Sequence, residues 1–232
     1  MRKITLLVLF IYTFFNAQSV EIEYSINKDK SNTNYSLFVE GQKSLFVPKD
    51  KCEKDHEDKN LIPLISSEII VEKDTDIKIF DKIGRTRVYY KPNIQKLSWE
   101  ISTEVKQENG FNLQKATTTL RDKKWIVWYI TDITIIEGPY LFKGLPGLVY
   151  SVNDENNTYQ FQLTQIKKEF TKCSLDLEKY KEITEEKYIS TINTSNTADN
   201  KLLESLMKLD IPKDGLESLN NKISESNILR GL

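Results

Sequence analysis

The chain has 232 residues, and its 33 Lys and Arg residues nearly balance its 34 Asp and Glu residues, so the formal net charge is −1. This balance excludes the basic surface that nucleic acid requires and the polybasic face that anionic lipid attracts. Charged residues form 29% of the chain, which predicts a well-solvated surface around one medium-sized domain.

Residues 1–17 have the layout of a secretory signal peptide. Arg2 and Lys3 precede an almost wholly apolar run over residues 4–15, and Ala17 is a small residue of the kind found at a cleavage site. This run of 12 residues is shorter than the roughly 20 that a transmembrane helix needs. We therefore expect cleavage after Ala17 and export to the periplasm, the cell envelope or the extracellular space, with an uncleaved anchor as the alternative.

Short alternating runs predict strands in the first part of the mature chain. Residues 20–24 alternate apolar and polar side chains, and residues 35–39 and 44–47 flank a short loop that contains Gly41. Two runs of this type on either side of such a loop are typical of a hairpin. Antiparallel strands are therefore expected from about residue 20 onward.

The clearest strand pattern covers residues 97–105, LSWEISTEV, where apolar and polar positions alternate over nine residues. Leu97, Trp99, Ile101 and Val105 fall on one face, and serine and glutamate side chains fall on the other. This alternation predicts a strand whose apolar face is covered and whose polar face is solvated.

Further hairpins are expected downstream. Asn109-Gly110 is a hairpin-turn dipeptide, and the runs 115–120 and 125–130 flank a charged turn. The second of these runs is apolar on both faces, which predicts a central strand. Residues 148–152 and 158–166 predict another hairpin, because the residues between them are mainly turn formers.

The pattern becomes helical in the last quarter of the chain. Ser174 can cap a helix that begins near Leu175, and apolar repeats predict further helices near residues 202–209 and 216–223. Residues 191–197 have the composition of a linker.

These elements predict a mainly β protein of the β-rich α+β kind. The architecture expected is an antiparallel curved sheet or a partly open barrel with a helical C-terminal region. The predicted organisation is a signal peptide at residues 1–17, a β-rich domain at residues 18–172 and a helical, partly flexible region at residues 173–232. No run after the signal peptide is apolar enough to span a membrane.

Cys52 and Cys173 are the two cysteines of the chain. Export makes a disulfide between them chemically allowed, and closing so long a loop stabilises a protein by about 4 kcal/mol in the chain-entropy model. Two separate thiols are the alternative, because the sequence does not show whether the two Cα atoms come close enough.

Residues 138–147, GPYLFKGLPG, hold three of the 8 glycines and two of the 6 prolines of the chain. Residues 145–148, LPGL, fit a type II turn. In such a turn, proline presets φ at the second position and glycine accepts a positive φ at the third. The segment is expected to leave one strand, bend sharply and enter another while its apolar residues cover an edge of the core. The residues expected to form this turn are Gly138, Pro139, Gly144, Pro146 and Gly147.

Aromatic residues concentrate in and just before this loop, and two interpretations follow. An aromatic surface beside the loop could bind an envelope protein, a peptide or an apolar ligand. Alternatively, the same side chains pack in the core. The residues predicted to bind under the first interpretation are Trp128, Tyr140, Phe142 and Leu145.

Residues 144–149, GLPGLV, resemble the motif that names the GLPGLI family, also called Porph_ging, of exported Bacteroidota proteins. The preceding elements also follow that family's order over residues 97–166, from the tryptophan strand through Lys115-Ala116 and Trp128-Tyr129 to Gly138-Pro139. The resemblance implies export and a β-rich domain, and it implies no established activity.

The chain departs from the family pattern at several positions. Leu113 stands where the family has a cysteine, Arg121-Asp122 where it often has Gly-Arg, and Val149 where it has the final isoleucine. A proline that is common before the loop is replaced, and Ile133-Thr134 stands there. No role that rests on the family's cysteine is therefore expected here.

The sequence predicts no catalytic residue, no resident metal and no cofactor, and the leading hypothesis is a non-enzymatic binding or accessory module. One alternative is a metal-handling protein that uses residues 52–58, which include His56, although no pair of ligands has the spacing of a structural zinc site. Another is a carboxylate-dependent hydrolase using Glu100, Glu104 or Asp132, which lie on or near predicted strands.

Overall fold

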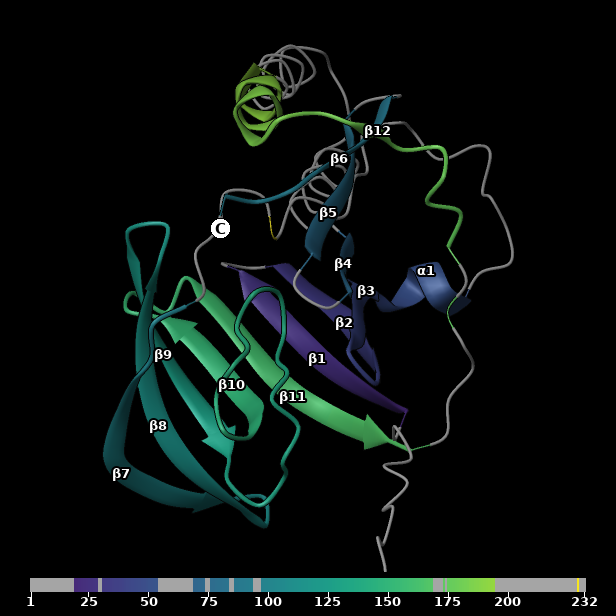
Figure 1. Ribbon diagram of the computed structural model, residues 1–232. Helices are drawn as coiled ribbons and strands as arrows, with labels where there is room; N and C mark the ends of the chain where they lie inside the picture. Colours follow the sequence, from purple (N-terminus) through teal and green to yellow (C-terminus); the bar gives the residue numbers. More distant parts are fainter. Residues whose placement is uncertain are drawn as a thin grey trace, which may run out of the picture.

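The computed structural model describes residues 19–28, 31–53, 69–73, 76–83, 86–93, 97–168, 173, 175–194 and 229. Its strands form one sheet in the order β12-β6-β5-β4-β3-β2-β1-β11-β10-β9-β8-β7 (Figure 1). The neighbours in this sheet are antiparallel except for β12 and β6, which are parallel. The sheet is curved and not closed into a barrel, which confirms the predicted mainly β class.

The strands occupy most of the described chain, and a single short helix interrupts them before β4. Their bounds are β1 Val20–Lys28, β2 Ser31–Glu40, β3 Lys43–Pro48, α1 Lys49–Glu53, β4 Ile69–Lys73, β5 Asp76–Ile83, β6 Thr86–Tyr90, β7 Glu100–Glu108, β8 Phe111–Leu120, β9 Lys123–Ile130, β10 Leu148–Asp154, β11 Tyr159–Lys167 and β12 Lys181–Glu182. The predicted hairpins between residues 35 and 47 and between residues 148 and 166 are confirmed as β2–β3 and β10–β11.

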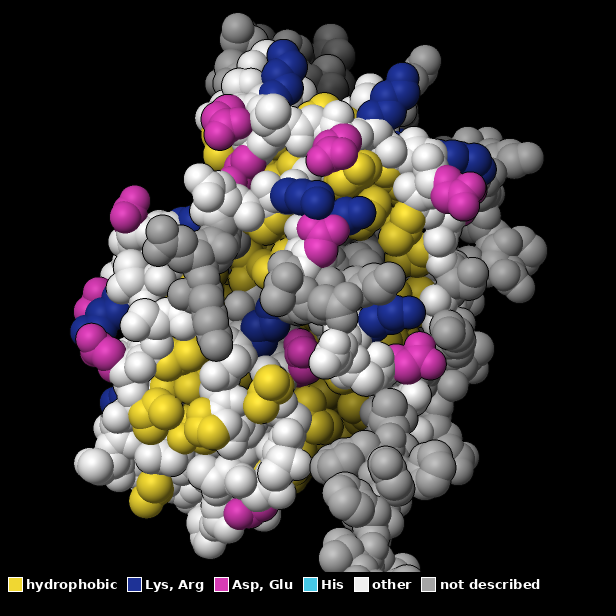
Figure 2. Space-filling view, in the orientation of Figure 1, with side chains coloured by type: hydrophobic (Ala, Val, Ile, Leu, Met, Phe, Trp, Pro, Cys, Tyr) yellow, Lys and Arg dark blue, Asp and Glu magenta, His cyan; other side chains and the backbone are white. Residues whose placement is uncertain are grey.

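Both charge signs are interspersed over the face of the molecule that Figure 2 shows, as the balanced composition predicts. Along β1 the alternation separates two faces of the sheet. Ile22, Tyr24 and Ile26 are fully buried on what we call the inner face. Glu21 and Glu23 lie on the opposite, outer face, where Lys167 pairs with both carboxylates.

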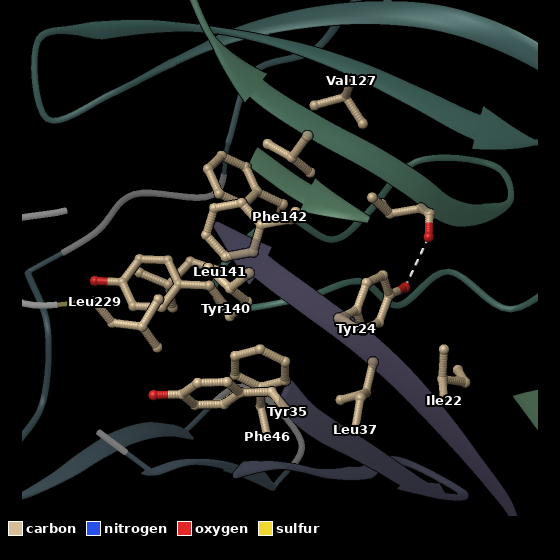
Figure 3. Close-up of a cluster of buried hydrophobic side chains, with 14 of the residues drawn as sticks. Ile22, Tyr24, Tyr35, Leu37, Phe46, Val127, Tyr140, Leu141, Phe142 and Leu229 are labelled. Carbon is tan, nitrogen blue, oxygen red and sulfur yellow. Dashed lines mark hydrogen bonds between the residues drawn. The ribbon is translucent and has the colours of Figure 1, made fainter. Parts of the chain in front are cut away.

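The core fills the inner face, and the segment between β9 and β10 covers part of it (Figure 1). The Phe142 ring lies 4.8 Å from the Trp125 ring of β9 and 5.7 Å from the Phe161 ring of β11, measured between centroids. Tyr140 lies beside Phe142 and close to Leu229 (Figure 3). The predicted fold-back of this segment onto the sheet is therefore what the structure has.

A smaller cluster on the outer face packs around Phe80, which stacks on Tyr89 and meets Tyr180 edge-on. Cys52 of α1 and Cys173 form a disulfide beside this cluster. The sequence left a disulfide and two separate thiols open as alternatives, and the structure has the disulfide. The bond links α1 to the segment that precedes β12.

The helix predicted to begin at Leu175 is wrong. Residues 175–180 form turns, and β12 then adds to the edge of β6, with the Ile183 amide donating to the Tyr89 carbonyl. The helix begins instead at residue 185 and extends to 194, so it includes part of the predicted linker. Thr184 caps it, because its hydroxyl accepts a hydrogen bond from the Lys187 amide at 3.2 Å.

Several sequence predictions fall outside the described residues. They are the signal peptide, most of the loop that contains His56, and the helices expected after residue 200. Among the described residues, none of the helices has the length and hydropathy needed to cross a membrane.

Candidate functional site at the edge of the inner face

The segment between β9 and β10 folds back on itself through backbone hydrogen bonds. The Gly144 amide donates to the Ile136 carbonyl at 2.9 Å, and the Val149 amide donates to the Glu137 carbonyl at 3.2 Å. The Tyr24 hydroxyl donates to the Val149 carbonyl at 2.7 Å, which links β1 to the end of the segment (Figure 3). These bonds satisfy backbone groups that no sheet neighbour pairs, so the segment lies against the core as a defined structure.

The glycines of this segment are needed for close packing more than for turn geometry. A Cβ atom at Gly147 would lie 2.1 Å from the Ile130 carbonyl oxygen, and one at Gly138 would lie 2.0 Å from the Phe142 carbonyl oxygen. The predicted positive φ at Gly147 is wrong, because the positive φ of this segment's glycines is at Gly144, at 90°. The LPGL sequence therefore forms no type II turn of the expected kind.

Tyr140 has a φ of 55°, in the left-handed region that bulky residues rarely adopt. It follows Pro139, whose carbonyl accepts a hydrogen bond from the Phe142 amide at 3.0 Å. Burial of the Tyr140 ring accompanies this conformation, since the side chain is almost fully enclosed. The local strain is therefore held by packing around the ring.

The residues predicted to bind a partner through this loop are core residues. Tyr140, Phe142 and Leu145 are 2%, 0% and 1% exposed. Their rings and methyl groups fill the space between the loop and the sheet, so they offer no surface to a ligand. The packing interpretation, which the sequence left open, is the one that the structure has for these three positions.

Trp128 lies on the outer face of β9, apart from the other three predicted residues. The Lys106 ammonium lies 4.4 Å from the centre of its ring, and the Lys115 ammonium lies 6.0 Å from it. Lys115 also pairs with Glu104 at 2.7 Å. The polar side chains of β7 and β8 thus cover this tryptophan, and the arrangement is a cation–π contact between strands.

Three large apolar side chains are exposed near the loop, and we call them the edge patch. Ile101 and Val105 of β7 are 50% and 69% exposed, and Ile136 of the loop is 60% exposed. Hydrophobic side chains gather over β7 to β9 and the adjoining loop in Figure 2. Because Ile101 and Val105 lie opposite Ala116 and Gln114 of β8, both project from the inner face.

The strand that carries Ile101 and Val105 is held at its start against the segment between β9 and β10. The Trp99 indole donates to the Lys143 carbonyl at 3.0 Å, which holds the start of β7 against the loop. On the neighbouring strands, the Tyr129 hydroxyl donates to the Gln114 side chain at 2.7 Å, and Gln114 lies opposite Val105. The loop therefore covers the inner face as far as Trp99 and leaves the rest of β7 open.

The sequence prediction of a covered apolar face on residues 97–105 holds at its first positions only. Leu97 and Trp99 are partly buried against the core, whereas Ile101 and Val105 are exposed. A register irregularity separates Ile101 from Val105, and the Gln114 side chain donates to the Ser102 carbonyl there at 2.8 Å. Both exposed side chains belong to β7, which is the last strand of the sheet.

Two titratable side chains of the loop are partly buried. Burial raises the pKa of the Glu137 carboxyl from its ordinary 4.5 to about 7, although a hydrogen bond from Ser44 opposes the change. Burial also lowers the pKa of the Lys143 ammonium from 10.5 to about 8. Both pKa values move in the direction that favours the neutral form, and burial is the cause in each case.

We expect Glu137→Gln to remove a pH dependence of stability between pH 4.5 and about 7. The folded state holds the Glu137 proton more tightly, so the contribution of Glu137 to wild-type stability is fully present below pH 4.5 and is lost as the pH rises through about 7, by up to roughly 3 kcal/mol. Urea unfolding at pH 5 and pH 8 measures this, with Glu155→Gln on an exposed turn as control. Parallel pH profiles for wild type and Glu137→Gln would contradict the burial of this carboxyl.

The carboxylates considered for hydrolysis are engaged separately. Glu104 pairs with Lys115, Glu100 accepts a hydrogen bond from Thr117 at 3.3 Å, and Asp132 accepts one from Asn112 at 2.7 Å.

The metal-handling alternative loses a ligand, because the sulfur of Cys52 is bonded to Cys173 and offers no thiolate. Within the described ranges, no group of three or more metal-ligating side chains converges.

No family model matches the chain, and no curated protein matches it. Among solved structures, it is similar to PNGF-II in two crystal forms, with 20% sequence identity and TM-scores of 0.57 and 0.58. The similarity covers 77% of this chain and 33% or 34% of that chain, so this chain spans about a third of the length of PNGF-II. A complex of MucB with MucA(peri) has 10% identity and a TM-score of 0.32, over 71% of this chain and 56% of that chain. The likeness to PNGF-II is one of fold alone.

Proposed function

We propose that the protein is an exported binding module of the cell envelope that docks an apolar surface of another polypeptide on its edge patch. The observation that carries the proposal is the exposure of Ile101, Val105 and Ile136 beside a loop that is otherwise closely packed. Exposed aliphatic side chains that occur singly are ordinary. Neighbouring ones on one face of an edge strand are typical of an interaction surface.

The distribution of polar side chains on β7 supports an apolar contact. Lys106 and Glu104 both engage the outer face, through the Trp128 ring and Lys115. Ile101 and Val105 remain on the inner face. Desolvation of these side chains would drive the association, so its affinity should depend little on salt.

The shape of the patch favours a polypeptide over a small molecule. A small-molecule site encloses most of its ligand in a concave pocket. Side chains that are half exposed or more protrude instead, and they suit the core of a protein interface. The register irregularity between Ile101 and Val105 also interrupts the strand edge, so docking by side-chain contact is favoured over addition of a strand.

Export is supported by residues far apart in the chain. The N-terminal residues 1–17 have the layout of a signal peptide, and the Cys52–Cys173 disulfide is of the kind that persists in oxidising compartments. The resemblance to the GLPGLI family implies the same location. Together these features favour a partner in the periplasm or at the cell surface.

Site-specific photo-crosslinking tests the proposal. A benzophenone amino acid placed at Val105 in the native host is expected to give one dominant crosslinked product. The same amino acid at Lys43, the exposed first residue of β3, should give none. Mass spectrometry of the product identifies the partner. Equal products from both positions, or none from Val105, would contradict a docking role for the edge patch.

We expect the double variant Ile101→Ser/Val105→Ser to remain folded and to lose the partner. Both side chains are largely solvated, so the free energy of unfolding should change by less than about 1 kcal/mol. Ile189→Ser is the matched control, because Ile189 is 47% exposed on the helix of residues 185–194. Urea unfolding measures the change in the free energy of unfolding. A decrease of several kcal/mol in the free energy of unfolding of the double variant would mean that these side chains belong to the core.

A further inference from the structure

A second feature lies on β5 and β6, nine and ten places away from β7 and its edge patch in the sheet order. It is an open cavity of about 450 Å³ whose lining consists of four cationic side chains and a hydroxyl. We propose that this cavity binds a small polyanion, a molecule carrying two or more phosphate-type or sulfate-type groups. The lining residues are Lys82, Thr86, Arg87, Lys179 and Lys181.

The sheet places two of these cations directly opposite each other. Lys82 of β5 and Arg87 of β6 are register partners in an antiparallel pair, so their side chains project from the same face. Like charges in that relation destabilise a sheet. A bound anion between the two cations would offset this cost.

Further positive charge reaches the same region. Lys51 of α1 lies within electrostatic range of both Lys82 and Arg87, and burial together with their repulsion lowers the pKa of Lys51. Asp81 and Asp50 oppose part of this effect. The region therefore carries an excess of positive charge that nearby carboxylates offset in part.

Asp176 is an acidic residue beside the cavity lining, where it pairs with Lys179 at 2.6 Å and also interacts with Arg87. The described residues of the cavity lining include no carboxylate. Asp176 therefore positions Lys179 at the rim and leaves the interior to cationic donors.

The chemistry of the lining favours phosphate-type groups. Arg87 offers a planar fork of donors, the lysines offer mobile point charges, and Thr86 offers a hydroxyl donor. A volume of about 450 Å³ is in the range of small-molecule sites and exceeds what one phosphate fills. Because the chain as a whole has a net charge of −1, a long nucleic acid is a poor match.

The disulfide helps to build this site. Cys173 is bonded to Cys52 of α1, and the following residues reach Tyr180, whose ring meets Phe80 on β5. Lys179 and Lys181 flank Tyr180, so the same contacts fix one wall of the cavity against the β5–β6 hairpin.

Isothermal titration calorimetry with the folded, oxidised protein tests the proposal, with tripolyphosphate, inorganic phosphate and chloride as separate probes. We expect tripolyphosphate to bind with one-to-one stoichiometry and inorganic phosphate to bind at least tenfold more weakly. The double variant Lys82→Gln/Arg87→Gln should weaken tripolyphosphate binding by about tenfold or more, as expected for the loss of charged hydrogen bonds.

Lys43→Gln is the matched control, because Lys43 lies opposite Lys73, at the far end of the sheet strands from the Lys82–Arg87 pair. The affinity of the Lys43→Gln variant for tripolyphosphate should equal that of the wild type. If the double variant fails to fold, Lys181→Gln at the exposed rim gives the same comparison. Absence of wild-type binding at millimolar tripolyphosphate, or equal weakening by Lys43→Gln, would overturn the proposal.

Discussion

Replacing Gly147 by alanine is expected to destabilise the fold by about 3 kcal/mol or more. The added Cβ atom would lie 2.1 Å from the Ile130 carbonyl oxygen and 2.9 Å from a carbon of the Tyr129 ring. Both neighbours belong to β9, whose residues at this end are buried, so neither can move aside cheaply. The variant must therefore shift the loop away from the sheet and expose part of the core.

Gly110→Ala provides the control for this prediction. Gly110 has a φ of 82° and no neighbouring atom within 4 Å of a built Cβ. Its substitution should cost only the left-handed backbone conformation, about 1–2 kcal/mol. Urea unfolding midpoints at a constant slope compare the two variants. A loss for Gly147→Ala no larger than that for Gly110→Ala would show that the loop does not press on β9.

Removal of the disulfide is the second change with a large expected effect. The bond joins residues 121 positions apart, and in the chain-entropy model a loop of that length stabilises by roughly 4–5 kcal/mol. We expect Cys52→Ala/Cys173→Ala to lose about 3–5 kcal/mol of unfolding free energy. The segment that carries Tyr180 should also exchange its amide hydrogens faster.

Reducing agent supplies the control for the disulfide prediction. It should lower the thermal midpoint of the wild type towards that of the double variant and leave the double variant unchanged. Equal stability of the oxidised wild type and the double variant would mean that α1 and the segment after Cys173 hold their positions without the bond.

Local patterns predicted most of the sheet. Alternation and the dipeptide Asn109-Gly110 located β7 and β8, and both turn residues have the positive φ that such a hairpin turn requires. A run apolar on both faces located β9 between two neighbours. These signals are short-range, so one sequence carries them without knowledge of the tertiary structure.

Long-range effects explain the errors. A helix at residues 175–183 has the right spacing of apolar residues, but pairing with β6 and the contact of Tyr180 with Phe80 stabilise turns followed by the short strand β12 there. The LPGL sequence is compatible with a type II turn, but the approach of Gly147 to β9 selects another conformation. In both cases a tertiary contact overrides the local preference.

The candidate site was only partly predictable. The sequence located Ile101 and Val105 on the apolar face of a strand, but exposure depends on which strand ends the sheet, and pattern does not encode that order. No sequence pattern singled out Ile136, because it lies in an irregular segment before the GLPGLV motif. Tyr140 and Phe142 looked equally suited to a surface or a core, and only the fold-back of the loop decides between them.

The central claim is that the edge patch serves binding and not folding, and the most direct test is the dissociation constant of the partner crosslinked at Val105. The double variant Ile101→Ser/Val105→Ser should bind that purified partner at least about tenfold more weakly than wild type, as expected when apolar groups at the centre of an interface are removed. Ile189→Ser should bind like wild type. Unchanged affinity in a folded double variant would contradict the account.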